Sequence, residues 1–313
     1  MRVAVIDLGT NTCNLLIAEM NSRGYEILHQ SKQLVKLGDD KIRENEISAA
    51  ATSRVLESFQ NHQKIISDYH AEKVRVVATS AVRTAENKIE FLEQISDNAG
   101  WLVRLISGEK EAEMIFEGVL LAFNEFKNPA LILDIGGGSN ELIIAHNKKM
   151  LWKESQPTGM ARVINRFKIS DPIQPNDIEQ LKNFYFESHK TAFEKCKTEN
   201  VKTLVGCSGA FDTIADMIDQ VNPGEKMRKT QEISLEDFYD VFQTLIKSTR
   251  EQRLLMKGMD MVRVDLIVPA VILIEHLISK IGITQITQTD FALREGVLFE
   301  MMNFSQTKSD QKI

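Results

Sequence analysis

Two stretches of this chain share one pattern of hydrophobic and polar positions. An apolar run from Ala4 ends at Asp7, a polar turn follows, and a second apolar run returns as far as Ile17. The same order of residue types recurs without gaps from residue 131 to residue 144, with Asp134 in the place of Asp7. An apolar run, a tight turn and a returning apolar run are typical of a buried β-hairpin. The pattern therefore predicts two hairpins, 127 positions apart, as an internal repeat.

The segments around the hairpins predict alternating strands and helices. Apolar residues recur at helical spacing over 48–70, 177–197 and 235–250, and the β-branched run 74–78 predicts a strand. A Ser-x-x-Asp capping box at Ser234 marks the start of the last of these helices. Strands that alternate with helices favour an α/β fold.

The length of 313 residues favours two domains. Because the balance turns helical after the second hairpin, we place the domain change near residues 115–125. The first predicted domain is residues 1–120 together with a C-terminal helix at about 292–313, and the second is residues 121–291.

Composition and charge exclude several classes of function. A net charge of −6 argues against a nucleic-acid partner, which requires a broad basic surface. The longest apolar run, residues 266–274, is far shorter than the ~20 residues of a membrane span, so no membrane partner is expected. The N-terminus lacks a signal-peptide pattern, and three scattered cysteines fit a reducing compartment. We therefore expect a cytoplasmic protein.

The two hairpin turns are suited to phosphate. Glycine lets successive backbone N–H groups point at one ligand, and such a nest binds phosphate oxygens without a cationic surface. Hydroxyl groups from Thr10, Thr12 and Ser139 add donors. A single glycine-rich turn often binds nothing, but two copies that both place an Asp before the turn favour a ligand site.

Seven segments, in this order along the chain, resemble the exopolyphosphatase / guanosine pentaphosphate phosphohydrolase family. That family belongs to the superfamily of actin, sugar kinases and heat-shock chaperone ATPases. The resemblance implies two actin-like ATPase (ribonuclease H-like) domains with an interdomain cleft, Mg²⁺ as cofactor and a homodimer. The segments are Asp7–Thr12, Ala78–Asn87, Ile106–Ala112, Leu133–Leu142, Gly206–Gly209, Arg263–Asp265 and Leu293–Leu298.

The same resemblance assigns roles to single residues. It implies that Glu111 is the catalytic carboxylate, although Glu109, Glu111 and Glu113 also suit a helix N-terminus without any catalytic role. Asp134, Glu141 and, ranked lower, Asp7 are the metal candidates; a strand-end Asp also caps turns. The phosphate-binding candidates are Gly9, Thr10, Asn11, Thr12, Arg83, Gly136, Gly137, Gly138, Ser139, Gly206, Ser208 and Gly209. Lys36, Arg263 and Arg294 are weaker candidates of the same kind.

The expected reaction is release of orthophosphate from the end of inorganic polyphosphate. Removal of the 5′-terminal phosphate of guanosine pentaphosphate would use the same residues, so the motifs do not separate these substrates. An acceptor-dependent phosphotransferase and a non-catalytic phosphate sensor are the alternatives from other classes.

Overall fold

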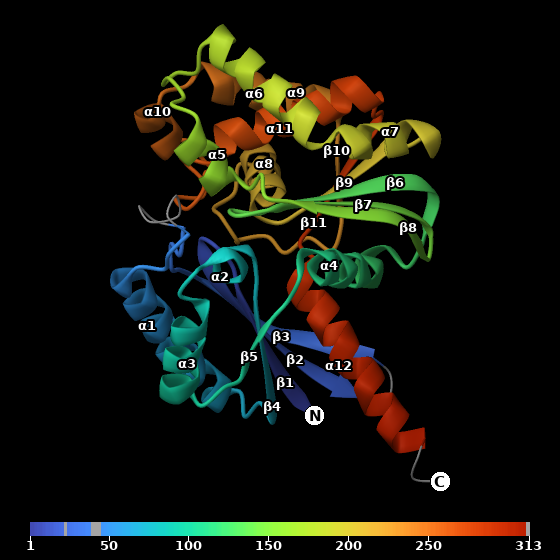
Figure 1. Cartoon of the computed structure of the whole chain (residues 1–313). Coiled ribbons are helices and arrows are strands. Elements are labelled where there is room, and N and C mark those ends of the chain that lie inside the picture. Colours follow the sequence, from blue (N-terminus) through green and yellow to red (C-terminus); the bar gives the residue numbers. More distant parts are fainter. Residues whose placement is uncertain (22–23, 39–44, 311–313) are drawn as a thin grey trace. The chain divides into compact units, whose positions relative to one another are not determined.

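The computed structural model describes residues 1–21, 24–38 and 45–310, with 304–310 described by their backbone alone. The chain divides into two compact units (Figure 1). Unit 1 comprises Met1–Gly118 and Leu293–Ile313, and unit 2 comprises Val119–Ala292. In the described part of the chain, no helix has both the length and the apolar character needed to cross a membrane.

Unit 1 contains a five-stranded sheet in the order β3-β2-β1-β4-β5. The first three strands form an antiparallel meander, and β4 and β5 extend it in parallel with β1. This confirms the first predicted hairpin and the predicted strand at 74–78. The strands are β1 (Arg2–Leu8), β2 (Thr12–Asn21), β3 (Gly24–Leu34), β4 (Lys73–Ala78) and β5 (Val103–Leu105).

Helices cover both faces of this sheet, with α1 and α3 on one face and α12 on the other (Figure 1). The Ser48 hydroxyl caps α1 by accepting from the N–H of Ala51. Gly296 allows α12 to approach α4 closely, since a Cβ at this position would lie 1.8 Å from the Met114 carbonyl oxygen. The helices are α1 (Ala49–Asp68), α2 (Ser80–Thr84), α3 (Lys88–Ala99), α4 (Gly108–Phe123), which continues into unit 2, and α12 (Leu293–Asp310).

Unit 2 contains a six-stranded sheet in the order β10-β11-β9-β6-β7-β8. Strands β6, β7 and β8 form an antiparallel meander, and β9 and β11 run parallel to β6. The second predicted hairpin is thereby confirmed, and both sheets continue a meander with two parallel strands. The strands are β6 (Phe126–Ile135), β7 (Asn140–Asn147), β8 (Lys149–Gln156), β9 (Thr203–Cys207), β10 (Gln231–Ile233) and β11 (Gln285–Thr289).

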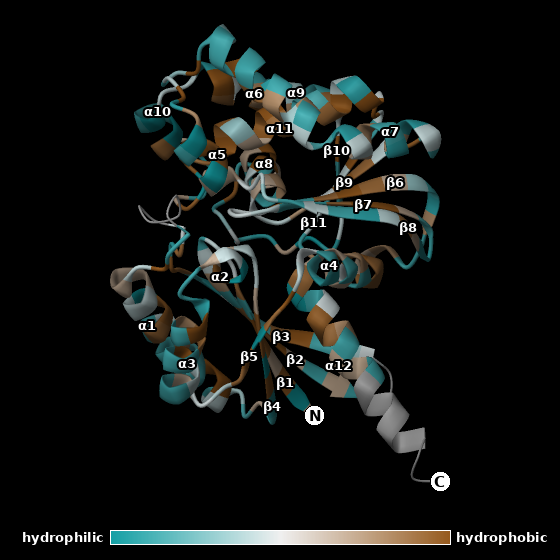
Figure 2. Cartoon of the chain, viewed as in Figure 1, coloured by the Kyte–Doolittle hydropathy of each residue, from teal (hydrophilic) through white to brown (hydrophobic). Residues whose placement is uncertain are grey.

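The helices of unit 2 pack around α11 (Ile267–Ile281), in which eleven residues are buried. Hydrophobic residues gather in the sheet strands and in α11 (Figure 2). The single helix predicted over 177–197 is wrong, because the chain breaks at His189 into two helices. The remaining helices are α5 (Met160–Arg166), α6 (Pro175–Ser188), α7 (Lys190–Thr198), α8 (Gly209–Asp219), α9 (Leu235–Lys247) and α10 (Arg250–Leu254).

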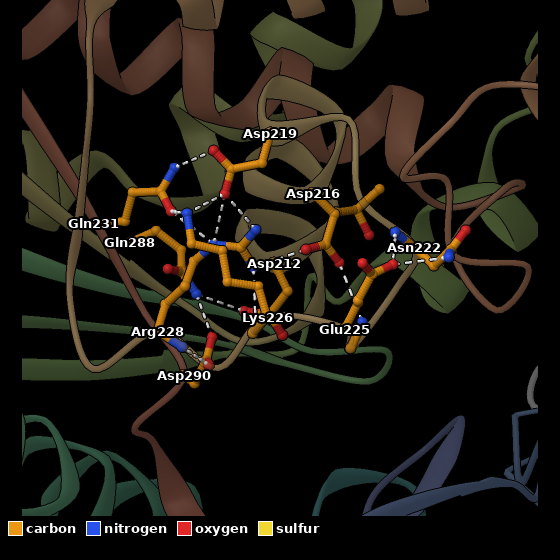
Figure 3. A network of polar contacts seen from close by, with 12 residues as sticks. Asp212, Asp216, Asp219, Asn222, Glu225, Lys226, Arg228, Gln231, Gln288 and Asp290 are labelled. Carbon is orange, nitrogen blue, oxygen red and sulfur yellow. Dashed lines mark hydrogen bonds and ion pairs between the residues drawn. The ribbon is translucent and has the colours of Figure 1, made fainter.

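A polar network ties the segment after α8 back onto that helix (Figure 3). The guanidinium of Arg228, only 4 % exposed, donates to Asp216 and Asp219 on α8, each at 2.7 Å. Its backbone N–H donates to Asp290, and Gln288 donates to Asp290 and Asp212. Six polar side chains therefore fix the connection between α8 and β10.

Candidate active site

The two repeat turns are closed by the same hydrogen bond. In the first, the N–H of Gly9 donates to the Thr12 carbonyl at 2.9 Å; in the second, the N–H of Gly136 donates to the Ser139 carbonyl at 3.0 Å. A Cβ on Gly136 would meet that carbonyl oxygen at 2.6 Å, so the second turn requires glycine here. The sequence repeat is thus also a repeat of backbone geometry.

The carbonyl groups of the first turn are bound by the segment after β3. Backbone N–H groups at residues 35 and 36 donate to the Asn11 carbonyl at 2.9 and 3.0 Å, and Gly38 donates to the Thr10 carbonyl at 3.2 Å. The N–H groups of Thr10 and Asn11 donate to no other described residue. The turn therefore offers donors, while its acceptors are occupied.

The second turn is arranged in the same way by a different element. The carbonyls of Gly136 and Gly137 accept from backbone N–H groups at the start of α5, and the carbonyl of Gly138 accepts from the Nε of Arg162 at 3.0 Å. Within the described residues, the N–H groups of Gly137, Gly138 and Ser139 have no acceptor. Three unbound N–H groups at successive residues form the kind of nest that binds an anion.

Buried polar groups form a hydrogen-bonded chain next to the second turn. Asn140 donates to the Thr158 carbonyl and hydroxyl at 2.9 and 3.0 Å, and that hydroxyl lies 3.2 Å from the Nε2 of His189. Burial, and after it the charge on His276, lowers the pKa of His189 to about 4. Gly159 touches the turn directly, since a Cβ there would lie 2.5 Å from the backbone of Gly137.

Asp7 precedes the first turn and pairs with Asn14 across the β1–β2 hairpin. Its Oδ2 accepts from the Asn14 amide at 3.0 Å, whereas its Oδ1 is buried and has no hydrogen-bond partner among the described residues. Burial raises the pKa of Asp7 to about 6, despite the Asn14 bond and the charge of Arg294. An unsatisfied buried carboxylate oxygen requires a proton, a cation or a donor from a ligand.

Asp134 precedes the second turn, where its partner across the hairpin is a second carboxylate, Glu141. The two are 7 % and 1 % exposed, and Glu141 accepts from the Ser155 hydroxyl at 2.7 Å. Like charges directly opposite in a sheet destabilise it unless they are neutralised. Mg²⁺ prefers one or two carboxylates completed by water and phosphate oxygens, so this pair fits that ion. No cluster of three or more metal-binding side chains occurs in the described part of the chain.

Glu111 lies in the first turn of α4, as expected, and Ser107 caps that helix. The Ser107 hydroxyl accepts from the N–H of Lys110 at 3.1 Å. Glu111 is 7 % exposed and forms an ion pair with Arg83, whose Nη1 lies 2.9 Å from Oε2. The structure thus brings together two residues that sequence reasoning had placed in separate roles.

The third glycine turn follows β9 and begins α8. Gly206 faces the ring of Phe211, and Ser208 adopts a positive φ of 70°. The guanidinium of Arg263 lies against Gly209, where a Cβ would be 2.3 Å from Nη2. The Nε of Arg263 is buried and has no hydrogen-bond partner in the part of the chain that the structure describes. Arg263 was only a weaker candidate from the sequence, because its distance from the turn along the chain hides this contact.

The candidates gather at one edge of each sheet. In unit 1, the strands β1, β4 and β5 are parallel neighbours. The first turn follows β1, Arg83 follows β4 and Glu111 follows β5. In unit 2, the second turn follows β6 and the third turn follows β9. These two strands are parallel neighbours, and Asp134 near the end of β6 pairs with Cys207 at the end of β9. Ligands of open α/β sheets bind outside the carboxyl ends of strands, so each unit presents its candidates where such folds bind ligands.

Comparison with known proteins agrees with this geometry. The family model for the Ppx/GppA phosphatase family matches residues 16–304. The solved structure of an exopolyphosphatase from Cytophaga hutchinsonii is 35 % identical, with a TM-score of 0.92 over 97 % of this chain and 98 % of its own. Exopolyphosphatase 2 of Mycobacterium tuberculosis is 27 % identical over 96 % of this chain and 98 % of its own length.

A crystal structure of the Aquifex aeolicus member of the Ppx/GppA family shares the fold at 24 % identity. Its TM-score is 0.82, over 97 % of this chain and 98 % of its own. The expected actin-like ATPase-type α/β fold is therefore confirmed, as is the resemblance carried by the seven segments. The chain belongs to the Ppx/GppA phosphatase family, and its reaction class is hydrolysis of phosphoanhydrides.

Proposed function

We propose that the protein is an exopolyphosphatase, which releases orthophosphate from the end of inorganic polyphosphate. The observation that carries the proposal is the pair of turns with bound carbonyls and unbound N–H groups. Donors fixed in this way suit the oxygens of a phosphoryl group, and they need no reorganisation when the substrate binds. The similarity to the Cytophaga hutchinsonii exopolyphosphatase supports the same substrate class.

Mg²⁺ is the proposed cofactor, and Asp134 and Glu141 are the residues proposed to hold it. When bound, it would neutralise charge on the phosphoryl oxygens of the substrate. The turn N–H groups at residues 137–139 bind and orient the phosphoryl group beside these carboxylates. Asp7 remains a candidate ligand of lower rank, since Asn14 occupies one of its oxygens.

Glu111 is the proposed general base. Its carboxylate is almost buried at the start of α4, and it accepts a proton from the attacking water. Hydrolysis of a phosphoanhydride requires this water to be in line with the departing oxygen, so a fixed carboxylate orients it. Whether the groups of both units act on one substrate molecule stays a prediction.

The experiment is phosphate release with Mg²⁺ and no acceptor, with polyphosphates of several lengths and guanosine pentaphosphate as substrates. We expect orthophosphate from polyphosphate, and a loss of ~10²–10⁴-fold in Glu111→Gln with substrate binding retained. Glu109→Gln, an exposed carboxylate of the same helix turn, is the matched control.

Three outcomes would contradict the proposal. A larger kcat/KM for guanosine pentaphosphate would identify the nucleotide as the substrate. A requirement for an acceptor would indicate a phosphotransferase. If the Glu111→Gln variant kept its full function, the protein would be a phosphate sensor that does not use this carboxylate.

A further inference from the structure

Of the guanidinium nitrogens of Arg83, only Nη1 donates a hydrogen bond to a described residue. Its Nη1 donates to Glu111 Oε2 at 2.9 Å and to the carbonyl of Ile106 at 3.0 Å, which occupies both hydrogens of that nitrogen. Nε and Nη2 have no partner among the described residues and are not buried. These two nitrogens form the edge of arginine that binds two oxygens of a phosphate at once.

The position of this arginine is fixed by three neighbouring segments. Arg83 lies in the last turn of the short helix α2, which follows β4, and its N–H donates to the Thr79 carbonyl at 2.9 Å. Ile106 directly follows β5, and Glu111 begins α4. One side chain thus joins the ends of two adjacent parallel strands to the helix that carries the carboxylate.

The pair is shielded enough to fix orientation. The side chains of Arg83 and Glu111 are 23 % and 9 % exposed. Ion pairs at the surface are weak because water competes for both partners, whereas a shielded, hydrogen-bonded pair holds its geometry. The ion pair with Arg83 therefore fixes the position of the Glu111 Oε2 atom.

We propose, resting on the proposed function, that Arg83 is the positioning residue of Glu111. Its Nη1 holds the carboxylate, while Nε and Nη2 hold the terminal phosphoryl group, so one rigid guanidinium sets the distance between base and phosphorus. The water oxygen bonds to phosphorus as Glu111 takes its proton. The bond to the bridging oxygen breaks, its electron pair stays on the departing polyphosphate, and the proton returns to solvent.

The proposal differs from two simpler roles of this arginine. A residue that only binds phosphate would change KM, and its effect would be independent of Glu111. A residue that only stabilises the fold would change thermal unfolding and leave kcat per folded molecule intact. A residue that acts through Glu111 changes kcat, and its effect disappears once the carboxylate is gone.

The test is a double-mutant cycle of Arg83→Ala and Glu111→Gln, measured as kcat and KM on polyphosphate. We expect Arg83→Ala alone to lower kcat ~100-fold, as displacement of a catalytic group by about 1 Å does. In the Glu111→Gln background we expect kcat to change by about twofold or less, with KM still raised. Arg75→Ala, an exposed arginine on β4, is the matched control.

Arg83→Lys keeps the charge and serves if the alanine variant does not fold. An ammonium donates from a single point, so we expect kcat to fall ~10-fold or more at nearly unchanged thermal stability. Additive effects in the cycle, or a change confined to KM, would overturn the inference while the wild type still hydrolyses polyphosphate. A wild type that releases no phosphate would instead overturn the proposed function, and the inference with it.

Discussion

At the residue scale, the site depends on groups whose partners are fixed by backbone geometry. The sequence predicted the glycine turns from their repeated pattern, and through its family resemblance it assigned roles to Glu111 and Asp134, which stay predictions. It did not predict that Arg83 pairs with Glu111 or that Arg263 lies on Gly209. Both contacts join segments that are far apart in sequence, so no local pattern records them. The same is true of His189, because no local sequence pattern indicates its contact with Thr158 beside the second turn.

His189 should make stability depend on pH. Its pKa in the folded state is about 4, below its ordinary value of 6.5, because burial disfavours the charged ring. The neutral ring of His189 therefore contributes fully to the free energy of unfolding above pH 6.5. This contribution, up to ~3 kcal/mol, is lost as the pH falls towards 4. We expect the free energy of unfolding in urea to fall between pH 7 and pH 5, and to fall less in His189→Gln.

The carboxyl groups of Asp7 and Asp290 act in the opposite direction. Burial raises the pKa of each to about 6, so their contribution is present below pH 4 and is lost as the pH rises to 6. They are common to wild type and variant, which isolates the effect of the histidine. His70→Asn, an exposed position, is the control, and equal pH slopes in all three proteins would contradict the assignment.

At the scale of elements, periodicity predicted the hairpins and most helices, but not where helices break. The apolar pattern over 177–197 continues through His189, while the chain bends there so that α6 and α7 both pack on α11. Tertiary packing thus overrides a continuous helical pattern. The segment between α8 and β10 was not assigned any structure from the sequence, and the Arg228 network is what orders it (Figure 3).

Arg228→Met should test that network. Burial alone would raise the pKa of Asp219, but bonds from Lys226, Arg228 and Gln231 hold it at about 2. Removal of the buried cation leaves Asp216 without its ion-pair partner, so we expect a loss of ~3–5 kcal/mol in the free energy of unfolding. The measurement is urea unfolding at pH 7. Arg250→Met removes an exposed pair with Asp265 and should leave the midpoint unchanged; equal losses in both variants would contradict this account.

At the scale of the whole molecule, the duplicated hairpin organises the chain into two units with related sheets. The repeat was visible in the sequence because a buried strand pair and its glycine turn constrain residue type at every position. The two copies differ in the residue that faces the aspartate, which is Asn14 in unit 1 and Glu141 in unit 2. On the proposed function, this difference favours unit 2 for the proposed Mg²⁺ site.

Removal of divalent metal should therefore abolish phosphate release, and Mg²⁺ should restore it. We expect Glu141→Gln to need a higher Mg²⁺ concentration for half-maximal activity, because one of the two facing carboxylates is lost. Asn14→Ala should leave that concentration unchanged. The measurement is a Mg²⁺ titration of activity after treatment with a chelator, and identical titrations of wild type and Glu141→Gln would rule out this site.

The unbound N–H groups of the two turns have a consequence for how the protein responds to ionic strength. An amide hydrogen carries only a partial charge. A phosphate bound by backbone amides therefore releases few counterions from the protein or from the polyanion. Binding by lysine or arginine clusters would weaken steeply with added salt. We expect a plot of log KM against log salt concentration to have a shallow slope. This acidic protein would then bind its polyanionic substrate nearly as well at high salt as at low salt.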